Sequence, residues 1–472
     1  MKGNIRSLLQ SVTTFRVLLA LSILSSAITF IYGHITGFSD EGHYWSLAEG
    51  MHHGSFSAWY FLPVHVPETL RTWGYPFFLY LCQFISKSYW CPQIIQFILF
   101  LITIAMVIRL IRHYSSGYTA VNIFLFFLIF NNHIGFYAGV LIAENLTVFF
   151  TTLFVYIYIL RRDTFLKFIV LAILCFILFQ LRPIFMLFPA MLFFYILIFR
   201  RTLIKYAFVY TLVFAVTLIP FGLWNKSNHG VFKITPLEGG YGVALQGGYW
   251  DYRLPVGFTA PYYWGIAIDD DLLQPEFMPK NEKPLWARRY IHDWQQMEAE
   301  LDKGDVTRAD SMLKAYESDP AYKSKRNFYI YTTRYTVERE KMLKEKFINY
   351  VKEDPSFYVK TRVYVFFRQW VTGINKKELL AANGIKGYFK VLYPFLVTFI
   401  FILCGLFFIL YNLIRRNISI KQFHIFFLFI AYIAVVDIPF GVVSRYTVPV
   451  HLFVLMLTAL ILATKITKGY KQ

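Results

Sequence analysis

The stretch FRVLLALSILSSAITFIYGHITGFSDEGHYW occupies residues 15–45 and contains the two features from which the fold can be argued. Its beginning, Phe15 to Tyr32, is an apolar run close to the ~20 residues that a helix needs to cross a bilayer. Two adjacent carboxylates, Asp40 and Glu41, follow it. Because the run lacks a clear small-residue cleavage site and many apolar runs come after it, we interpret it as a retained first transmembrane helix and not as a secretory signal.

The composition is that of a chain whose solvent is largely lipid. Of the 472 residues, 57% are hydrophobic and 16% are charged, and the mean hydropathy is +0.47. The formal net charge of +19 comes from short basic clusters between apolar runs, where such clusters orient helices in the bilayer. We therefore expect a polytopic membrane protein in contact with membrane lipid, and no nucleic-acid partner.

The basic clusters also predict the topology. They lie near residues 2–16, 109–112, 161–167, 200–205, 415–421 and 465–471, and the positive-inside bias favours placing all of them in the cytoplasm. The apolar runs then pair into hairpins, and both termini lie inside. The predicted fold is an all-α polytopic protein of the inner (plasma) membrane with about ten transmembrane helices, at 15–33, 92–110, 119–136, 143–160, 165–181, 183–199, 203–224, 388–414, 421–438 and 447–465.

Two segments are left on the outer side. The first outer loop, 34–92, belongs to an N-terminal transmembrane module of residues 1–224. It contains an apolar stretch at 75–85 that we predict to be a juxtamembrane helix, because an eleventh span would place Arg109 and Arg112 outside. The second, 225–386, is too long for an ordinary connection and precedes the C-terminal transmembrane helices of 387–472.

The long outer segment differs from the rest of the chain in charge. Only seven of the 28 acidic residues lie elsewhere, so this segment holds the other 21. We expect a mixed soluble domain facing the periplasm or the outside. Near its end, at 341–370, basic residues alternate with apolar ones around Asp354-Pro355, which predicts two amphipathic helices at the membrane surface.

The few remaining acids converge on one face of the predicted membrane protein. Asp163 falls on the inner side, and the other six fall on the outer side: Asp40, Glu41, Glu49, Glu68, Glu144 and Asp437. Arg71, Arg182 and Arg445 share that outer face. Since ionisable groups near the bilayer core are costly, their convergence predicts a polar site, suited to a reaction in which a base removes a proton while cations hold a departing phosphate.

A structural alternative stays open for two of these acids. Glu144 and Asp437 could simply pair with Arg182 or Arg445 as buried ion pairs. The first outer loop also contains five histidines, at 34, 43, 52, 53 and 65, but their spacings match no metal-binding motif and we expect no metal. Cys82 and Cys91 could pair if both face an oxidising compartment.

Several short segments, taken in order, resemble the C-type fold of membrane glycosyltransferases that use polyprenyl-phosphate sugars, specifically the bacterial relatives of protein O-mannosyltransferases and lipid A aminoarabinose transferases. The similarity spans nearly the whole chain, although Trp73 stands where a proline is usual. It rests on Phe38-Ser39-Asp40-Glu41-Gly42-His43-Tyr44-Trp45, Arg71-Thr72-Trp73-Gly74-Tyr75-Pro76, Ala143-Glu144-Asn145-Leu146, Leu181-Arg182-Pro183, Pro220-Phe221-Gly222-Leu223-Trp224-Asn225 and Arg445-Tyr446-Thr447-Val448-Pro449.

The resemblance implies inverting transfer of a sugar from a polyprenyl-phosphate donor to a hydroxyl or amine of a protein, lipid or glycan acceptor, without a cofactor. It implies that Asp40 is the general base and that Glu41 shapes the site or binds the acceptor. We also expect repulsion between these neighbouring carboxylates to raise the pKa of one of them. The other candidates are Glu144 for the acceptor or the shape of the site, Arg445, Arg182 and Arg71 for the donor phosphate, and Tyr446 and Asn225 for further donor contacts.

Two other functions fit the same sequence features. A polytopic transporter, or a flippase for lipid-linked sugars, would use the polar groups to line a path, although transporters usually bury charge near the bilayer midplane and have repeated halves. An inactive scaffold would use the outer segment to bind a partner.

Overall fold

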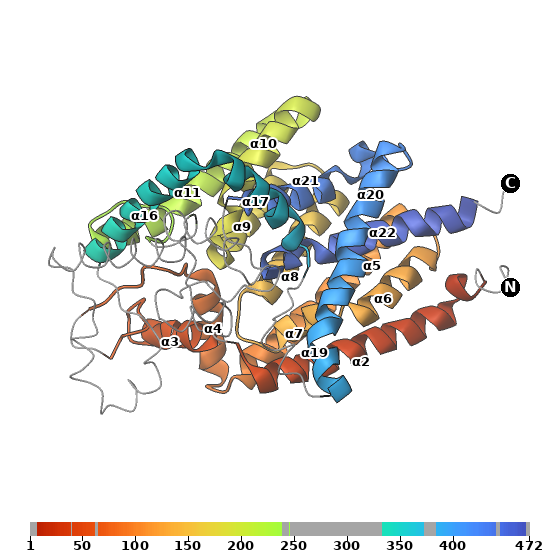
Figure 1. Cartoon of the computed structure of the whole chain (residues 1–472), viewed down its shortest axis with the longest axis horizontal. Coiled ribbons are helices and arrows are strands. Elements are labelled where there is room, and N and C mark those ends of the chain that lie inside the picture. The colour runs from red at the N-terminus through yellow and green to blue at the C-terminus, as the bar shows by residue number, and fades with distance from the viewer. Residues whose placement is uncertain are drawn as a thin grey trace, which may run out of the picture.

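The computed structural model describes residues 7–38, 40–61, 65–237, 245, 333–371, 384–439 and 444–468, and every regular element within these ranges is a helix (Figure 1). Five helical stretches are long and apolar enough to cross a bilayer. The helical membrane class is therefore confirmed. The five are α2 (Val12–Thr36), α5 (Trp90–Tyr114), Arg201–His229, which includes α11 (Ile204–His229), Leu392–Ile414, and Arg445–Thr467, which includes most of α22 (Val448–Lys468).

The other apolar helices have 12 to 17 residues, less than the ~20 that cross a bilayer without tilt or local thinning. They are α4 (Gly74–Ile85), α6 (Thr119–Phe130), α8 (Glu144–Leu160), α9 (Phe165–Leu181), α10 (Phe188–Phe199) and α21 (Ile420–Val436). Of the predicted helices, 165–181 coincides with α9. The stretch 75–85, for which a juxtamembrane helix was predicted, forms the helix α4.

Three predicted helices are interrupted. The one predicted at 119–136 is wrong as a continuous helix, because it breaks at Asn131 into α6 and a short α7 (His133–Ala138). The amide of Asn132 bonds to the Ser25 hydroxyl, and the carbonyl of Asn132 accepts from Thr29, so backbone and side chain both have partners on α2. The one at 183–199 begins with a 3-10 turn, Pro183–Leu187. The one at 388–414 is α19 (Gly384–Val397), a π-helical turn at Thr398–Leu403 and α20 (Cys404–Ile414).

The outer segments contain further helices. In the first loop, α3 (Glu41–His52) begins directly at the carboxylate pair, and sequence reasoning did not predict it. Near the end of the second segment, α16 (Thr333–Glu353) and α17 (Pro355–Arg368) confirm two helices divided at Asp354-Pro355. Within the predicted mixed domain of 225–386, residues 238–244, 246–332 and 372–383 lie outside the described residues.

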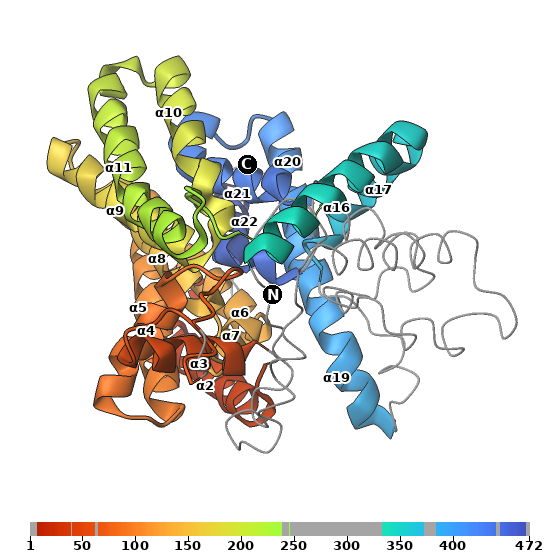
Figure 2. The ribbon, with the colours of Figure 1, turned by 90° about the vertical axis from the view of Figure 1, so that its left-hand side faces the viewer.

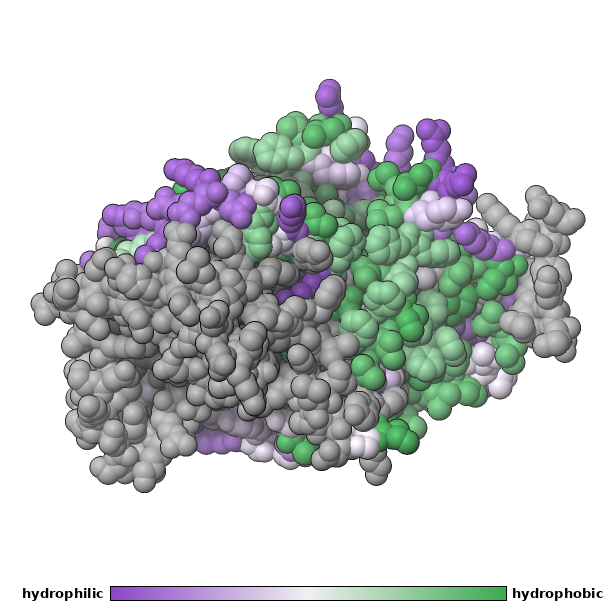
Figure 3. Space-filling view, in the orientation of Figure 1, coloured by the Kyte–Doolittle hydropathy of each residue, from purple (hydrophilic) through white to green (hydrophobic). Residues whose placement is uncertain are grey.

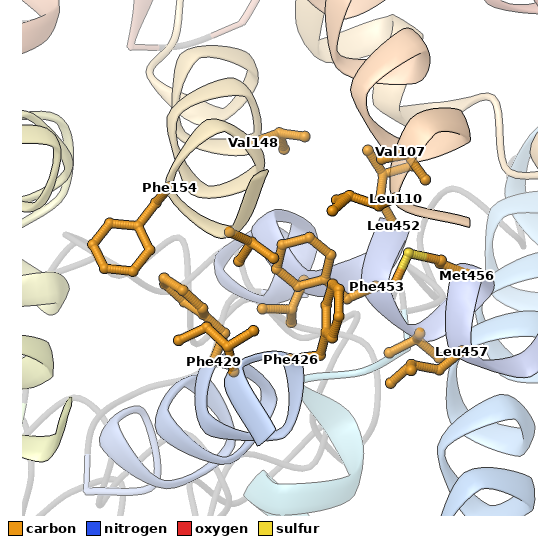
Figure 4. Close-up of a cluster of buried hydrophobic side chains, with 14 of the residues drawn as sticks. Val107, Leu110, Val148, Phe154, Phe426, Phe429, Leu452, Phe453, Met456 and Leu457 are labelled. Carbon is orange, nitrogen blue, oxygen red and sulfur yellow. The ribbon is translucent and has the colours of Figure 1, made fainter. Parts of the chain in front are cut away.

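Helix α22 lies at the centre of the bundle and is the most buried of the five candidate spans. Its side chains Leu452, Phe453, Met456 and Leu457 face residues of α5, α8 and α21 (Figure 4). The rings of Phe429 and Phe453 lie 6.2 Å apart. Close packing of this kind holds α22 in place, and Arg445 lies in the 3-10 turn Ser444–Thr447 that precedes it.

Hydrogen bonds between helix ends establish which ends lie together. The Asn122 amide at the start of α6 donates to the Leu9 carbonyl before α2 (2.8 Å), whereas Thr29 near the end of α2 donates to the carbonyl of Asn132 (2.8 Å). These two helices therefore run parallel. Helix α22 runs the other way, since His451 in its first turn lies 3.0 Å from His133 beyond the end of α6.

Helix α7 approaches α2 through two glycines. A Cβ added to Gly139 would lie 2.0 Å from the Phe30 carbonyl oxygen, and one added to Gly33 would lie 2.6 Å from that of Phe136. Only a residue without a side chain fits such an approach. This close contact between α7 and α2 sets the path of the chain from α7 toward Glu144.

The outer surface of the bundle is apolar. Exposed Leu and Ile residues follow α2, among them Leu21, Leu24 and Ile28, and others follow α19 and α20. Figure 3 shows the broad hydrophobic face that such residues give to the bundle, with hydrophilic residues gathered toward its margins. An apolar face of this extent is typical of a protein surrounded by lipid.

Candidate functional site

Asp40 lies between two arginines from distant parts of the chain. Its Oδ1 is 3.2 Å from an Nη2 atom of Arg71, and its Oδ2 accepts a hydrogen bond of 3.1 Å from Arg445. Burial alone would raise the pKa of Asp40, but the guanidinium groups of Arg71, Arg445 and Arg182 lower it to about 2. Asp40 is therefore a stable carboxylate at neutral pH in this state.

Glu144 is the second carboxylate of the cluster. It is the first residue of α8, where the partial positive charge of the helix N-terminus favours an anion. Its Oε1 accepts a hydrogen bond from Arg182 and lies 3.3 Å from Nε of Arg445. Arg445 thus joins Asp40 and Glu144, so that the ion-paired cluster combines three guanidinium groups with two carboxylates.

Aromatic rings line the same arginines. The guanidinium carbon of Arg445 lies 4.8 Å from the ring centre of Phe38, and that of Arg71 lies 4.8 Å from the ring of Tyr44. The ring of Tyr446 is 4.8 Å from Arg182. Such cation–π contacts hold planar guanidinium groups in a fixed orientation. Tyr446 was predicted to contact the donor, and in this structure its ring contacts Arg182, one of the arginines predicted to bind the donor phosphate.

Gln180 holds the segment around Arg71 against the end of α9. Its carbonyl accepts from the Thr72 hydroxyl at 2.6 Å, and its side-chain oxygen accepts from the Trp73 N–H at 3.2 Å. A Cβ on Gly74 would lie 2.5 Å from the same Gln180 carbonyl oxygen. This contact sets the distance between Arg71 and Arg182, and no feature of the sequence pointed to Gln180.

Glu68 supports Arg71 from the other side. Its Oε1 accepts hydrogen bonds from the backbone N–H groups of Leu70 and Arg71, and its Oε2 lies 2.9 Å from Nε2 of His43. Burial would raise the pKa of Glu68, but His43 and these hydrogen bonds lower it. The spacing Glu-x-x-Arg was a usable signal, because an acid often accepts from N–H groups two and three residues later.

Glu41 points away from the arginines. Its Oε1 accepts a 2.7 Å hydrogen bond from the N–H of Leu141, and burial raises its pKa. A raised pKa at one member of the Asp40-Glu41 pair was expected, but the cause is burial of Glu41 and not repulsion between the two carboxylates. Glu41 therefore ties α3 to the segment before Glu144.

The arginines retain N–H groups without partners in the described part of the chain. Arg71 Nε and Arg445 Nη1 are buried and have no hydrogen-bond acceptor there, and Oε2 of Glu144 has no donor. Arg445 Nε has only its 3.3 Å ion-pair contact with Glu144. Buried N–H groups are normally satisfied. Three positive charges facing two negative ones, with spare donors, form a site that suits an additional anion.

The remaining predicted site residues lie elsewhere or pair differently. The Asn225 amide donates to the carbonyls of Lys233 and Thr235, which fixes the loop after α11, and none of its contacts among the described residues reaches the arginines. Asp437 is buried and has no ion pair with Arg182 or Arg445 in this structure. The alternative that these acids form buried ion pairs with Arg182 or Arg445 therefore fits Glu144 and does not fit Asp437.

The histidines and cysteines of the first outer loop were considered as metal ligands and as a disulfide pair. No group of three metal-binding side chains occurs among the described residues. His34 instead lies 2.7 Å from Gln93, and His65 lies 3.1 Å from Asn228. Cys82 and Cys91 are free thiols, with the Cys91 sulfur 3.6 Å from the Cys82 carbonyl oxygen.

Comparisons with known proteins do not assign this arrangement to a family. No family model, curated protein or solved structure matches the chain.

Proposed function

We propose that the protein is an inverting membrane glycosyltransferase that moves a sugar from a polyprenyl-phosphate donor to a hydroxyl or amine of a protein, lipid or glycan. The observation that carries this proposal is the meeting of Asp40, Glu144 and three arginines from five separate segments, at an ion-paired cluster with spare N–H donors. A carboxylate beside an anion site provides a base next to a place for the leaving phosphate.

The proposed topology has about ten spans with the cluster at the outer face of the inner (plasma) membrane. Hydrogen bonds between helix ends support it. The end that gathers Leu9 and Asn122 lies next to the basic residues of the first cluster and of residues 109–112, which favour the cytoplasm. The opposite end leads to Asp40 and Leu141. The helices of 12 to 17 residues other than α4 would then cross the bilayer, because the polar cluster shortens the apolar thickness that they must span.

In the proposed reaction, Asp40 accepts the proton of the acceptor group as the acceptor oxygen or nitrogen bonds to the anomeric carbon. The bond between that carbon and the phosphate oxygen breaks, and the oxygen keeps the electron pair. The phosphate diester becomes a monoester with one further negative charge. Arg445, Arg182 and Arg71 stabilise that charge, which is largest after the bond breaks, so their effect favours the transition state.

The ion pairs of Asp40 bear on its strength as a base. With Arg71 and Arg445 on its two oxygens, its pKa is held near 2, which makes a weak base. A donor phosphate that takes hydrogen bonds from the same guanidinium groups would weaken their pull on Asp40, so its pKa rises when the donor is bound. The base is then strongest when the donor is in place.

The alternative is a transporter or lipid-linked-sugar flippase, with an inactive scaffold as a third option. To test these, the cell-envelope glycans of cells with and without the gene are compared by mass spectrometry, and the purified protein is reconstituted in vesicles. The glycosyltransferase proposal expects one sugar substituent to disappear without the gene. Movement of a lipid-linked sugar across vesicles, with no new glycosidic bond formed, would overturn it in favour of the transporter.

A further inference from the structure

Helix α17 is hydrogen-bonded to both sides of the segment that carries Arg445. The carbonyl of Gln369, just after α17, accepts a 2.8 Å hydrogen bond from the Thr447 hydroxyl, and its side-chain amide donates to the Ala434 carbonyl at 3.0 Å. Arg362 donates to the carbonyl of Ile438 at 2.8 Å. Gln369 is fully buried, so these bonds lie where water does not compete with them.

Thr447 lies two residues after Arg445, in the short 3-10 turn that opens α22. Its hydroxyl is also 2.9 Å from Nε2 of His451, one turn further along the helix. Thr447 therefore joins the end of α17 to the element that orients Arg445.

Helix α16 contacts the opposite side of the cluster. The hydroxyl of Thr333, at its first residue, lies 2.6 Å from Nδ1 of His229. Nε2 of the same imidazole lies 3.2 Å from the carbonyl oxygen of Glu68. Because the Glu68 side chain accepts from the Arg71 N–H, this chain of bonds ends at the backbone of Arg71.

The two helices are joined as one unit. Asp354 accepts from the Phe357 N–H at 3.0 Å and so caps α17, and Pro355 occupies its first turn, where proline is favoured. Tyr350 of α16 is buried against Phe357 and Tyr358 of α17. Figures 1 and 2 show α16 and α17 together on one side of the transmembrane bundle.

We propose that the α16–α17 pair is a brace that sets the positions of Arg71 and Arg445 relative to each other, with Thr333 and Thr447 as the positioning residues at its two ends. This inference rests on the proposed function only in taking phosphate as the anion that the two arginines hold.

One test measures the brace without any ligand. The full-length protein is studied in detergent. Thr447→Val removes the hydroxyl and Thr447→Ser keeps it. The control is Thr464→Val, which removes a hydroxyl on α22 that donates only to the Leu460 carbonyl of the same helix. Hydrogen exchange is followed in peptides containing the amides of Leu70 and Arg71. Loosening of the brace is expected to speed their exchange about fivefold in Thr447→Val, since local opening governs exchange.

Thr447→Ser and Thr464→Val should leave that exchange unchanged. If Thr447→Val also leaves it unchanged, no connection runs between the two ends and the brace is overturned. This result does not depend on whether the protein binds phosphate.

A second test uses farnesyl phosphate as the probe, with binding measured by calorimetry. Thr447→Val and Thr333→Val should each weaken binding about tenfold, as expected for one misplaced charge-assisted hydrogen bond. Because both break one brace, the double variant should bind about as well as either single variant. Losses that multiply would instead mean two independent local effects and would contradict the brace.

Absence of binding by the wild-type protein would contradict the proposed function. The exchange experiment would then decide the brace by itself.

Discussion

Replacing Arg445 by Gln tests the phosphate site most specifically among the arginines. Arg445 contacts both carboxylates of the cluster, through Nη2 to Asp40 at 3.1 Å and Nε to Glu144 at 3.3 Å. Its Nη1 is buried and has no hydrogen-bond acceptor in the described part of the chain. A phosphate oxygen placed there would receive a charge-assisted hydrogen bond from a donor that now has no acceptor.

The size of the effect follows from the number of bonds. One charge-assisted hydrogen bond contributes roughly 1.5–3 kcal/mol, and each 1.4 kcal/mol is about a tenfold change in Kd. Loss of one such bond therefore weakens binding of a short polyprenyl phosphate by about ten- to 150-fold. Arg445→Lys keeps the charge and loses the two-pronged donor geometry, so it should fall between the wild type and Arg445→Gln.

The assay is calorimetric titration of farnesyl phosphate into the purified variants in one detergent. Arg415→Gln is the matched control, because Arg415 is an exposed arginine after α20 whose guanidinium carbon lies 5.6 Å from the Tyr411 ring. Thermal unfolding of each variant separates loss of binding from loss of fold. If Arg445→Gln is as stable as the wild type and binds farnesyl phosphate with the same Kd, the phosphate site is refuted.

Three further substitutions test the structural account. Glu41→Gln can keep the bond from Leu141 and removes a buried charge. Since burial raises the pKa of Glu41, the variant should unfold at a higher temperature than the wild type at pH 8. The difference should shrink as the pH falls through the raised pKa of the folded state and vanish only below the ordinary glutamate value of 4.5. Gly139→Ala brings a Cβ to 2.0 Å from the Phe30 oxygen and should destabilise by roughly 1–3 kcal/mol, measured by denaturant unfolding. Asn225→Ala, which frees two carbonyls, should lower the unfolding temperature and leave the Kd for farnesyl phosphate unchanged.

The helices most accessible to sequence reasoning are those bounded by local signals. Helix α9 starts after Thr164, whose side chain accepts from the Lys167 N–H, and ends at Arg182-Pro183, where proline disfavours helix in the preceding residue. Both signals are in the sequence, and the predicted bounds match. Similarly, Asp354-Pro355 divides α16 from α17 as predicted.

What the sequence does not contain is the pairing between distant segments. The break at Asn131 depends on partners about a hundred residues away on α2, and hydropathy alone continues across it. In the same way, topology predicted that Asp40 and the arginines share a face, but not that Arg445 would join Asp40 to Glu144 or that Glu41 would turn toward Leu141. Those contacts depend on packing, as at Gly74 and Gln180, and no periodicity encodes them.

The central claim is that the protein transfers a sugar with Asp40 as the base. The direct measurement is transfer from a radiolabelled polyprenyl-phosphate sugar to acceptors of the native envelope, by wild-type and Asp40→Asn protein in nanodiscs. The account predicts a new glycosidic product with the wild type and a rate lower by about 10²–10⁴ with Asp40→Asn, the range for loss of a general base. Equal transfer by both proteins would contradict the role of Asp40, and no transfer by the wild type from any such donor would contradict the proposed function itself.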